Sequence, residues 1–183
     1  TAQAAQIVLL DSDFSRMPEI VLEGRRVVNN VQRSASLFLV KNLFSLLLTI
    51  FSTVLMISYP LMPSQVSLIS MFTIGIPGFL LALEPNKSRI KGHFLGNVLL
   101  KALPAGLTDF FAVSALVICG HVFNIPSTDI ATASTLLIAV VGFMIMIKIS
   151  HPFNNFKYGI LALNIFGLIF CGLFLDNLFA MSD

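Results

Sequence analysis

Residues 37–58, LFLVKNLFSLLLTIFSTVLMIS, decide the fold class of this chain. Apart from hydroxyl side chains, the run is interrupted only by Lys41 and Asn42. It is long enough for a helix to cross a hydrocarbon core of roughly 30 Å, which takes about 20 residues. A helix is predicted because backbone groups in lipid must be bonded within their own segment, and the run lacks the alternation of barrel strands.

Four further apolar runs follow, at residues 66–83, 98–120, 130–147 and 158–175. The chain has 183 residues, of which 56% are hydrophobic and 11% charged, and its mean hydropathy is +0.91. This composition excludes an ordinary water-soluble domain. We predict an all-α membrane protein, a polytopic bundle of five transmembrane helices in the lipid bilayer with a short N-terminal cytoplasmic strand and a stalk helix.

The first 36 residues are polar and differ from the rest of the chain. Residues 6–10 predict a short buried strand, whose partner strands would have to come from another part of a larger protein. From Pro18 the pattern is helical, and no breaker follows until Pro60. One helix is therefore predicted to run from water directly into the first span.

Lysine and arginine residues collect on one side of the predicted membrane. The connections at residues 84–97 and 148–157 contain them, whereas those at 59–64 and 121–129 do not. Cytoplasmic loops retain positive charge, so the N-terminus is predicted to be cytoplasmic. Because the basic residues line membrane edges, the net charge of +2 gives no reason to expect a nucleic-acid partner.

The second span contains Gly75, Ile76, Pro77 and Gly78 at its centre. Proline removes a backbone donor and crowds the preceding turn, so the helix is predicted to kink or unwind there. Transporters use such breaks to present carbonyl oxygens to ions, although a simple kink is an equally good interpretation of the residues alone. Residues 103–106, Leu-Pro-Ala-Gly, predict a second break in the third span.

Two motifs of different type resemble those of P-type ATPases. Residues 7–13, IVLLDSD, and 23–30, EGRRVVNN, look like the end of the phosphorylation domain and the stalk helix of that family. Pro77 with residues 83–85, Leu-Glu-Pro, resembles the Pro and Glu-Pro that bracket the cytoplasmic half of its sixth transmembrane helix. The Phe-Thr-Ile-Gly-Ile-Pro pattern looks closest to a bacterial branch of cation pumps that includes calcium transporters of mycobacteria and streptococci.

The resemblance implies a division of the chain. Residues 1–17 would end the cytoplasmic phosphorylation domain, 18–36 would form the stalk helix and 37–183 the transmembrane domain. The five spans would be helices five to nine, with a tenth expected beyond them. The Asp-Lys-Thr-Gly motif and the nucleotide domain are absent from this sequence, so no catalytic residue is expected here. ATP and Mg are expected cofactors of the full-length pump.

The resemblance also implies where ion ligands would lie. Asn42 and Thr73 match the family's Asn and Thr, but Ser45, Ser70 and Ile74 stand where calcium pumps have Glu, Asn and Asp. Hydroxyl, amide and carbonyl oxygens suit alkali or alkaline-earth ions rather than copper or zinc. The candidate ligands, with carbonyls for the isoleucines, are Asn42, Ser45, Ser70, Thr73, Ile74, Ile76 and Asp109.

Two charged residues inside the spans are candidates for function, because an intramembrane charge costs at least a few kcal/mol unless it is paired or hydrated. Lys41 either reaches the ion cavity as a built-in positive charge or extends to the membrane interface. Asp109 is the only carboxylate well inside a span, and it is expected to bind the ion, to pair with Lys41 or Lys101, or to be structural.

Other residue types indicate no further site. His93, His121 and His151 fall at different places and sides, so no metal beyond the transported cation is expected. Cys119 and Cys171 are isolated within spans and are interpreted as packing residues.

The leading hypothesis is the transmembrane portion of an ATP-driven cation pump, with the remaining helices and cytoplasmic domains of the same pump as partners. Calcium is one candidate ion. A secondary transporter or channel is the alternative from another class, since it can also contain a broken helix and a buried acid. A P-type ATPase that moves a lipid or a polyamine is a further alternative, because two expected carboxylates are missing.

Overall fold

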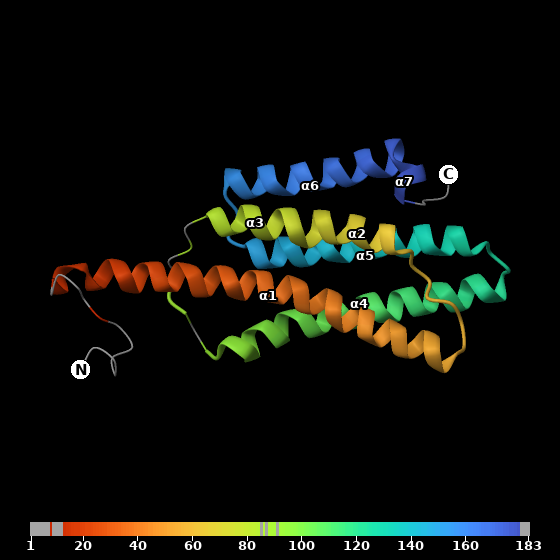
Figure 1. Cartoon of the computed structure of the whole chain (residues 1–183), viewed down its shortest axis with the longest axis horizontal. Coiled ribbons are helices and arrows are strands. Elements are labelled where there is room, and N and C mark those ends of the chain that lie inside the picture. Colours follow the sequence, from red (N-terminus) through yellow and green to blue (C-terminus); the bar gives the residue numbers. More distant parts are fainter. Residues whose placement is uncertain (1–7, 9–12, 85, 87, 91, 180–183) are drawn as a thin grey trace.

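The computed structural model describes residues 8, 13–84, 86, 88–90 and 92–179. The described residues contain helices and no strand, which confirms the predicted all-α fold (Figure 1). The predicted strand at 6–10 lies outside them except for Val8. The elements are η2 (Phe14–Arg16), α1 (Met17–Val54), α2 (Pro63–Ser70), η3 (Met71–Gly75), α3 (Ile76–Leu83), α4 (Phe94–Val122), α5 (Ser127–Ser150), α6 (Asn155–Phe174) and α7 (Asp176–Phe179).

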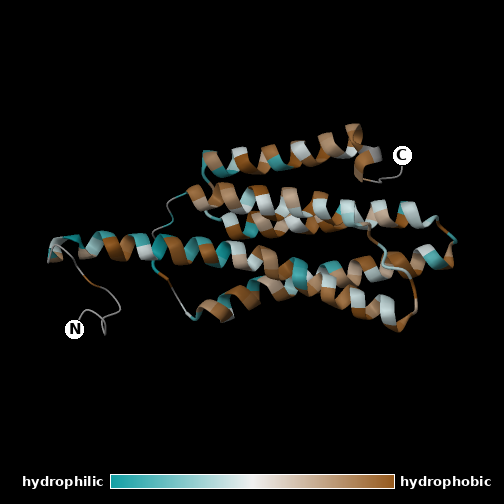
Figure 2. Cartoon of the chain, in the orientation of Figure 1, coloured by the Kyte–Doolittle hydropathy of each residue, from teal (hydrophilic) through white to brown (hydrophobic). Residues whose placement is uncertain are grey.

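Five helical segments are long and apolar enough to cross a membrane in the described part of the chain. They are α1 with η2, the segment from Pro63 to Leu83, α4, α5 and α6. Each contains most of one predicted span, although α1 ends at Val54 and not at residue 58. Figure 2 shows hydrophobic residues along the bundle and a concentration of hydrophilic ones where α1 projects from it.

Helix α1 has 38 residues and runs without interruption from Met17 to Val54. At 1.5 Å per residue it is about 57 Å long, well beyond a hydrocarbon core. Pro18 lies in its first turn, where a missing N–H costs no helical bond. The N-terminal part of α1 extends past the other helices (Figure 1), and we call that end of the bundle the stalk end.

The second span keeps its helical course through Pro77. Between α2 and α3 the five residues of η3 form a π-helix, in which the N–H of Ile76 donates to the oxygen of Met71. Pro77 then occupies the first turn of α3. The predicted unwinding is thus wrong, because the wider π turn removes the crowding that proline would cause in a regular helix. The interruption is a change of hydrogen-bond register.

The second break predicted at residues 103–106 is also wrong, since Pro104 lies inside the continuous helix α4. Neighbouring helices often stabilise proline within transmembrane helices. Here α4 packs along α1. Their approach is close one half-turn later, where a Cβ on Gly106 would lie 2.9 Å from Cδ2 of Leu43.

Two clusters of buried apolar side chains form the core. One lies toward the end opposite the stalk end and joins α1, α2, α4 and α5 through residues that include Phe44, Leu48, Ile69, Val113 and Ile138. The other lies toward the stalk end and comprises Leu37, Val40, Ile74, Ala102, Ile145 and Ile149. The candidate site lies between these clusters.

Glycines bring α5 and α6 against η3. A Cβ on Gly142 of α5 would lie 2.8 Å from Cγ2 of Thr73, and a Cβ on Gly167 of α6 would overlap the ring of Phe72. Gly159, on the same helix as Gly167, has open space around its Cα. The π turn is therefore packed against two helices that have no side chain at the point of contact.

Gly167→Ala is expected to destabilise the protein by about 1–3 kcal/mol, because the new methyl group overpacks the contact with Phe72. Gly159→Ala is the matched control and should be neutral or stabilising by up to about 1 kcal/mol, since alanine favours helix. Thermal unfolding of the full-length protein in detergent measures both. Equal unfolding temperatures for the two variants would contradict the close packing of α6 on η3.

Candidate functional site

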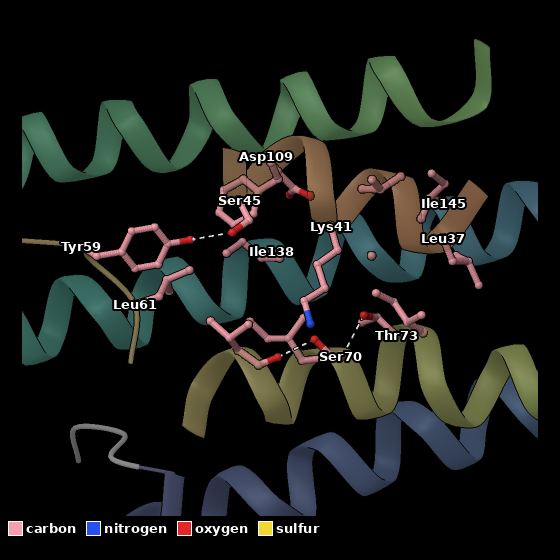
Figure 3. A pocket seen from close by; sticks show the side chains of 16 residues that line it. Leu37, Lys41, Ser45, Tyr59, Leu61, Ser70, Thr73, Asp109, Ile138 and Ile145 are labelled. Carbon is pink, nitrogen blue, oxygen red and sulfur yellow. Dashed lines mark hydrogen bonds between the residues drawn. The ribbon is translucent and has the colours of Figure 1, made fainter. Parts of the chain in front are cut away.

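A cavity of about 50 Å³ lies between α1, the α2–η3–α3 segment, α4 and α5. This volume accommodates several water molecules, each of which needs about 10–15 Å³ by this measure. Most of the lining is apolar and comes from the two core clusters. The polar side chains that line it are Lys41, Ser45, Tyr59, Ser70, Thr73 and Asp109 (Figure 3).

The two hydroxyls of the second span that line the cavity donate to their own helix. Ser70 Oγ lies 2.6 Å from the oxygen of Val66, and Thr73 Oγ1 lies 2.8 Å from the oxygen of Ile69. Because each hydroxyl hydrogen is used in this way, the lone pairs of the hydroxyl oxygens remain available. These oxygens can accept hydrogen bonds or coordinate a cation.

The π turn takes α-helical donors away from two peptide oxygens. Ile76 donates five residues back, to Met71, and Pro77 has no N–H. In a regular helix Ile76 would donate to the oxygen of Phe72 and residue 77 to the oxygen of Thr73, so both oxygens lose their α-helical donors.

Asp109 of α4 is the carboxylate of the cavity. Only 2% of the residue is exposed, and its Oδ1 atom has no hydrogen-bond partner among the described residues. Taking a carboxylate out of water without a partner costs several kcal/mol. The Asp109 carboxylate therefore needs a proton, a cation or a donor from elsewhere.

Lys41 of α1 is half-buried and reaches the cavity, and its ammonium group points toward Ser70 (Figure 3). No ion pair joins Lys41 or Lys101 to Asp109 in the part of the chain that the structure describes, so neither pairing expected from the sequence is formed. Lys101 lines a different cavity, at the stalk end.

The structure brings together five of the seven predicted ligand positions: Ser45, Ser70, Thr73, Ile74 and Asp109. Asn42 and Ile76 do not line the cavity. Asn42 is exposed on another face of α1, about 100° around the helix from Lys41. Of the residues at the predicted helix break, Pro77 is buried, Gly78 is half-buried and Gly75 is exposed.

Tyr59 and Gly142 also line the cavity, and the sequence did not predict either of them. The hydroxyl of Tyr59 lies 3.4 Å from Oγ of Ser45, so the connection after α1 folds back over the cavity. The position of Tyr59 directly before Pro60 was a signal for a rigid turn but not for its direction. Gly142 lies in a wholly apolar run, so the neighbouring residues do not indicate that it packs closely against another helix.

Proteins with similar sequences bear the names of cation-transporting ATPases. The chain is 33% identical over 182 residues to the "Probable cation-transporting ATPase exp7" of Streptococcus pneumoniae serotype 4, covering 95% of this chain and 23% of that protein. It is 34% identical over 164 residues to the "Calcium-transporting ATPase CtpE" of Mycolicibacterium smegmatis, covering 82% and 21%. A calcium-transporting ATPase of Bacillus subtilis is 27% identical over 82 residues, 45% of this chain and 9% of that protein. No family model and no solved structure matches the chain.

The chain is homologous to bacterial P-type cation-transporting ATPases. This confirms the resemblance seen in the sequence motifs. The chain spans less than a quarter of the length of the relatives that it matches over most of its own length. Its five candidate spans and its bacterial relatives support a bacterial integral membrane protein.

In this ATPase homologue the segments that carry the two motifs of the resemblance lie side by side at the stalk end. Glu84, which follows α3, lies 3.4 Å from Nη1 of Arg33 and 3.2 Å from Nζ of Lys157, and its Oε1 accepts a 2.7 Å hydrogen bond from Asn154. The amide of Asn30 donates to the oxygen of Ala82 at 3.0 Å. The Glu84 carboxylate, which follows α3, thus joins α1 to the start of α6.

Glu84→Gln is expected to destabilise the protein by about 3–5 kcal/mol, because Arg33 and Lys157 would keep buried charges without a counter-charge. Their side chains are 10% and 5% exposed. Glu23→Gln is the control, since Glu23 pairs with Arg26 at 3.1 Å on the exposed surface of α1 and such pairs contribute about 0–1 kcal/mol. Thermal unfolding of the full-length protein measures the difference. A Glu84 variant as stable as the Glu23 variant would contradict this role.

Proposed function

We propose that the chain forms the transmembrane portion of an ATP-driven P-type cation pump, and that the ion passes through the cavity between α1 and η3. The observation that carries this proposal is the Asp109 carboxylate, buried without a partner for Oδ1, in the same cavity as the π turn. Homology to cation-transporting ATPases supports it. A bound cation would supply the charge that Asp109 lacks.

The oxygen atoms around the cavity are hard ligands. They come from the Asp109 carboxylate and from the hydroxyls of Ser70 and Thr73, and in this proposal also from the peptide oxygen of Thr73, which has lost its α-helical donor. Hard oxygen donors favour alkali and alkaline-earth cations. The described residues contain no group of three or more His, Cys, Asp or Glu that would hold a transition metal. We infer calcium as the first ion to test, because two of the relatives are calcium-transporting ATPases.

Lys41 would act as a built-in positive charge beside the ion. Its ammonium group reaches the cavity without a carboxylate partner among the described residues, so it would raise the energy of a bound cation by repulsion. Such a charge favours release of the ion once the cavity opens. Ligands beyond those of this chain would come from the remaining helices of the pump, toward which the exposed Asn42 could face.

Coupling to ATP hydrolysis would pass through α1. In this proposal residues 1–17 end the cytoplasmic phosphorylation domain, residues 18–36 form the stalk and residues 37–183 form the transmembrane domain. The stalk end would face the cytoplasm, as the distribution of Lys and Arg indicates. ATP and Mg would be bound by domains outside this chain, and the pump would lie in the plasma membrane.

A lipid as the transported substrate is less well supported, because the relatives found are cation-transporting ATPases. A channel or secondary transporter is less well supported, because the relatives found are ATPases.

Asp109→Asn in the full-length pump is expected to lower the apparent cation affinity by about ten- to a hundredfold, because a charged ligand contributes about 1.5–3 kcal/mol. Asp129→Asn is the control, since Asp129 is exposed in the first turn of α5. The measurement is phosphoenzyme formation from ATP as a function of calcium concentration. An unchanged affinity in the Asp109 variant would remove this residue from the transport site.

Lys41→Met is expected to raise the apparent cation affinity by about tenfold, since it removes a positive charge beside the ion in a medium of low dielectric constant. Lys148→Met removes the same charge from an exposed position on α5 and should leave the affinity unchanged. The same phosphoenzyme assay separates the two variants. If Lys41→Met weakens calcium binding or has no effect, the lysine does not repel the ion.

A further inference from the structure

A second cavity, of about 150 Å³, lies at the stalk end. It is separated along the bundle from the cavity of the candidate site, and the two cavities share no lining residue. Its walls come from α1, the connection after α3, α4 and the end of α5, and they are polar except for Ile149. The side chains that the argument uses are Asn29, Gln32, Arg33, Asn86, Lys101 and His151.

The lining is positively charged. Arg33 is 8% exposed, and its partner Glu84 is shared with Lys157. Lys101 is half-buried, and no carboxylate pairs with it among the residues that the structure describes. Arg33 and the exposed Lys148 are both near enough to repel the Lys101 ammonium group. One carboxylate therefore faces several cations at this end of the bundle.

Neutral polar side chains complete the walls. The amide of Asn29 spans the opening between α1 and the connection after α3, where it donates to the oxygens of Asn86 and Ser88 at 3.0 Å each. This contact fixes one wall of the cavity beside Arg33. Gln32 lies three residues further along α1, where it is buried and also lines the cavity.

We propose that this cavity binds a phosphate group, with Lys101 and Arg33 as the charged donors and the amide of Gln32 as a neutral one. Charge-assisted hydrogen bonds from guanidinium and ammonium groups are the strongest that a phosphate oxygen accepts. Basic cavities between transmembrane helices at the cytoplasmic surface suit the phosphates of anionic lipid headgroups. A free phosphate in the cytoplasm has the same chemistry, so the two sources are distinguished by experiment.

The test measures acylation of Lys101 by a water-soluble amine reagent, read by peptide mass spectrometry, in the full-length protein in phosphatidylcholine nanodiscs. In one arm phosphatidylglycerol replaces part of the phosphatidylcholine, and in the other inorganic phosphate is added to the buffer. Saturating ligand is expected to slow acylation of Lys101 by about tenfold. The acylation of Lys148 in the same molecules is the internal control. Its rate should change by less than about twofold, because Lys148 is exposed and its charge is screened.

Protection in the lipid arm assigns the site to a headgroup, and protection in the buffer arm assigns it to free phosphate. Equal protection of Lys101 and Lys148, or protection of neither in both arms, overturns the proposal and leaves a water-filled cavity.

Retention of phosphatidylglycerol through detergent washing gives a second measurement if the lipid arm protects Lys101. Lys101→Met should then retain about tenfold less lipid, whereas Lys101→Arg should retain the wild-type amount because it keeps the charge. Loss of lipid from the arginine variant as well would contradict a role for the charge.

Discussion

The structure depends on one constraint, the missing backbone N–H of Pro77 in the middle of a membrane span. In lipid, peptide groups without partners are stable only where protein or a polar cavity surrounds them. The chain meets this requirement by widening the preceding turn into η3 and by surrounding it with α1, α5 and α6. Gly142 and Gly167 provide the close approach. The cavity of the candidate site lies on the side of η3 that faces α1 and α4.

Features that depend on local pattern were predictable from the sequence. The five spans and the long first helix follow from apolar run length and from the absence of a breaker before Pro60. The consequences of proline were predicted less well, because Pro77 and Pro104 present the same local signal. One is preceded by a π turn and the other lies within a regular helix. Neighbouring helices decide between these outcomes, and their packing is not visible in a local window.

Prediction of the candidate site was limited in the same way, because helix packing decides which side chains face the cavity. Ser45, Ser70, Thr73 and Asp109 were predicted from residue type and resemblance, and they line one cavity. Asn42 was predicted on the same basis, but the rotation of α1 about its axis turns it away from that cavity. Glu84 was recognised only as part of a motif, because its partners Arg33 and Lys157 lie far from it in sequence. Contacts between residues that are far apart in sequence cannot be predicted from a local pattern.

Under the proposed function, the ion pairs of Glu84 with Arg33 and Lys157 at the stalk end would be mechanically linked to the cavity of the candidate site. Arg33 lies eight residues before Lys41 on α1, about 12 Å along the helix, and Glu84 lies seven residues after Pro77, about 10 Å. A displacement of α1 is therefore applied to α3 at Glu84, just beyond the π turn. Within the second span, η3 has lost helical hydrogen bonds, so it offers the least resistance. Under the proposed function, movement of the stalk would therefore act on the π turn that borders the candidate site.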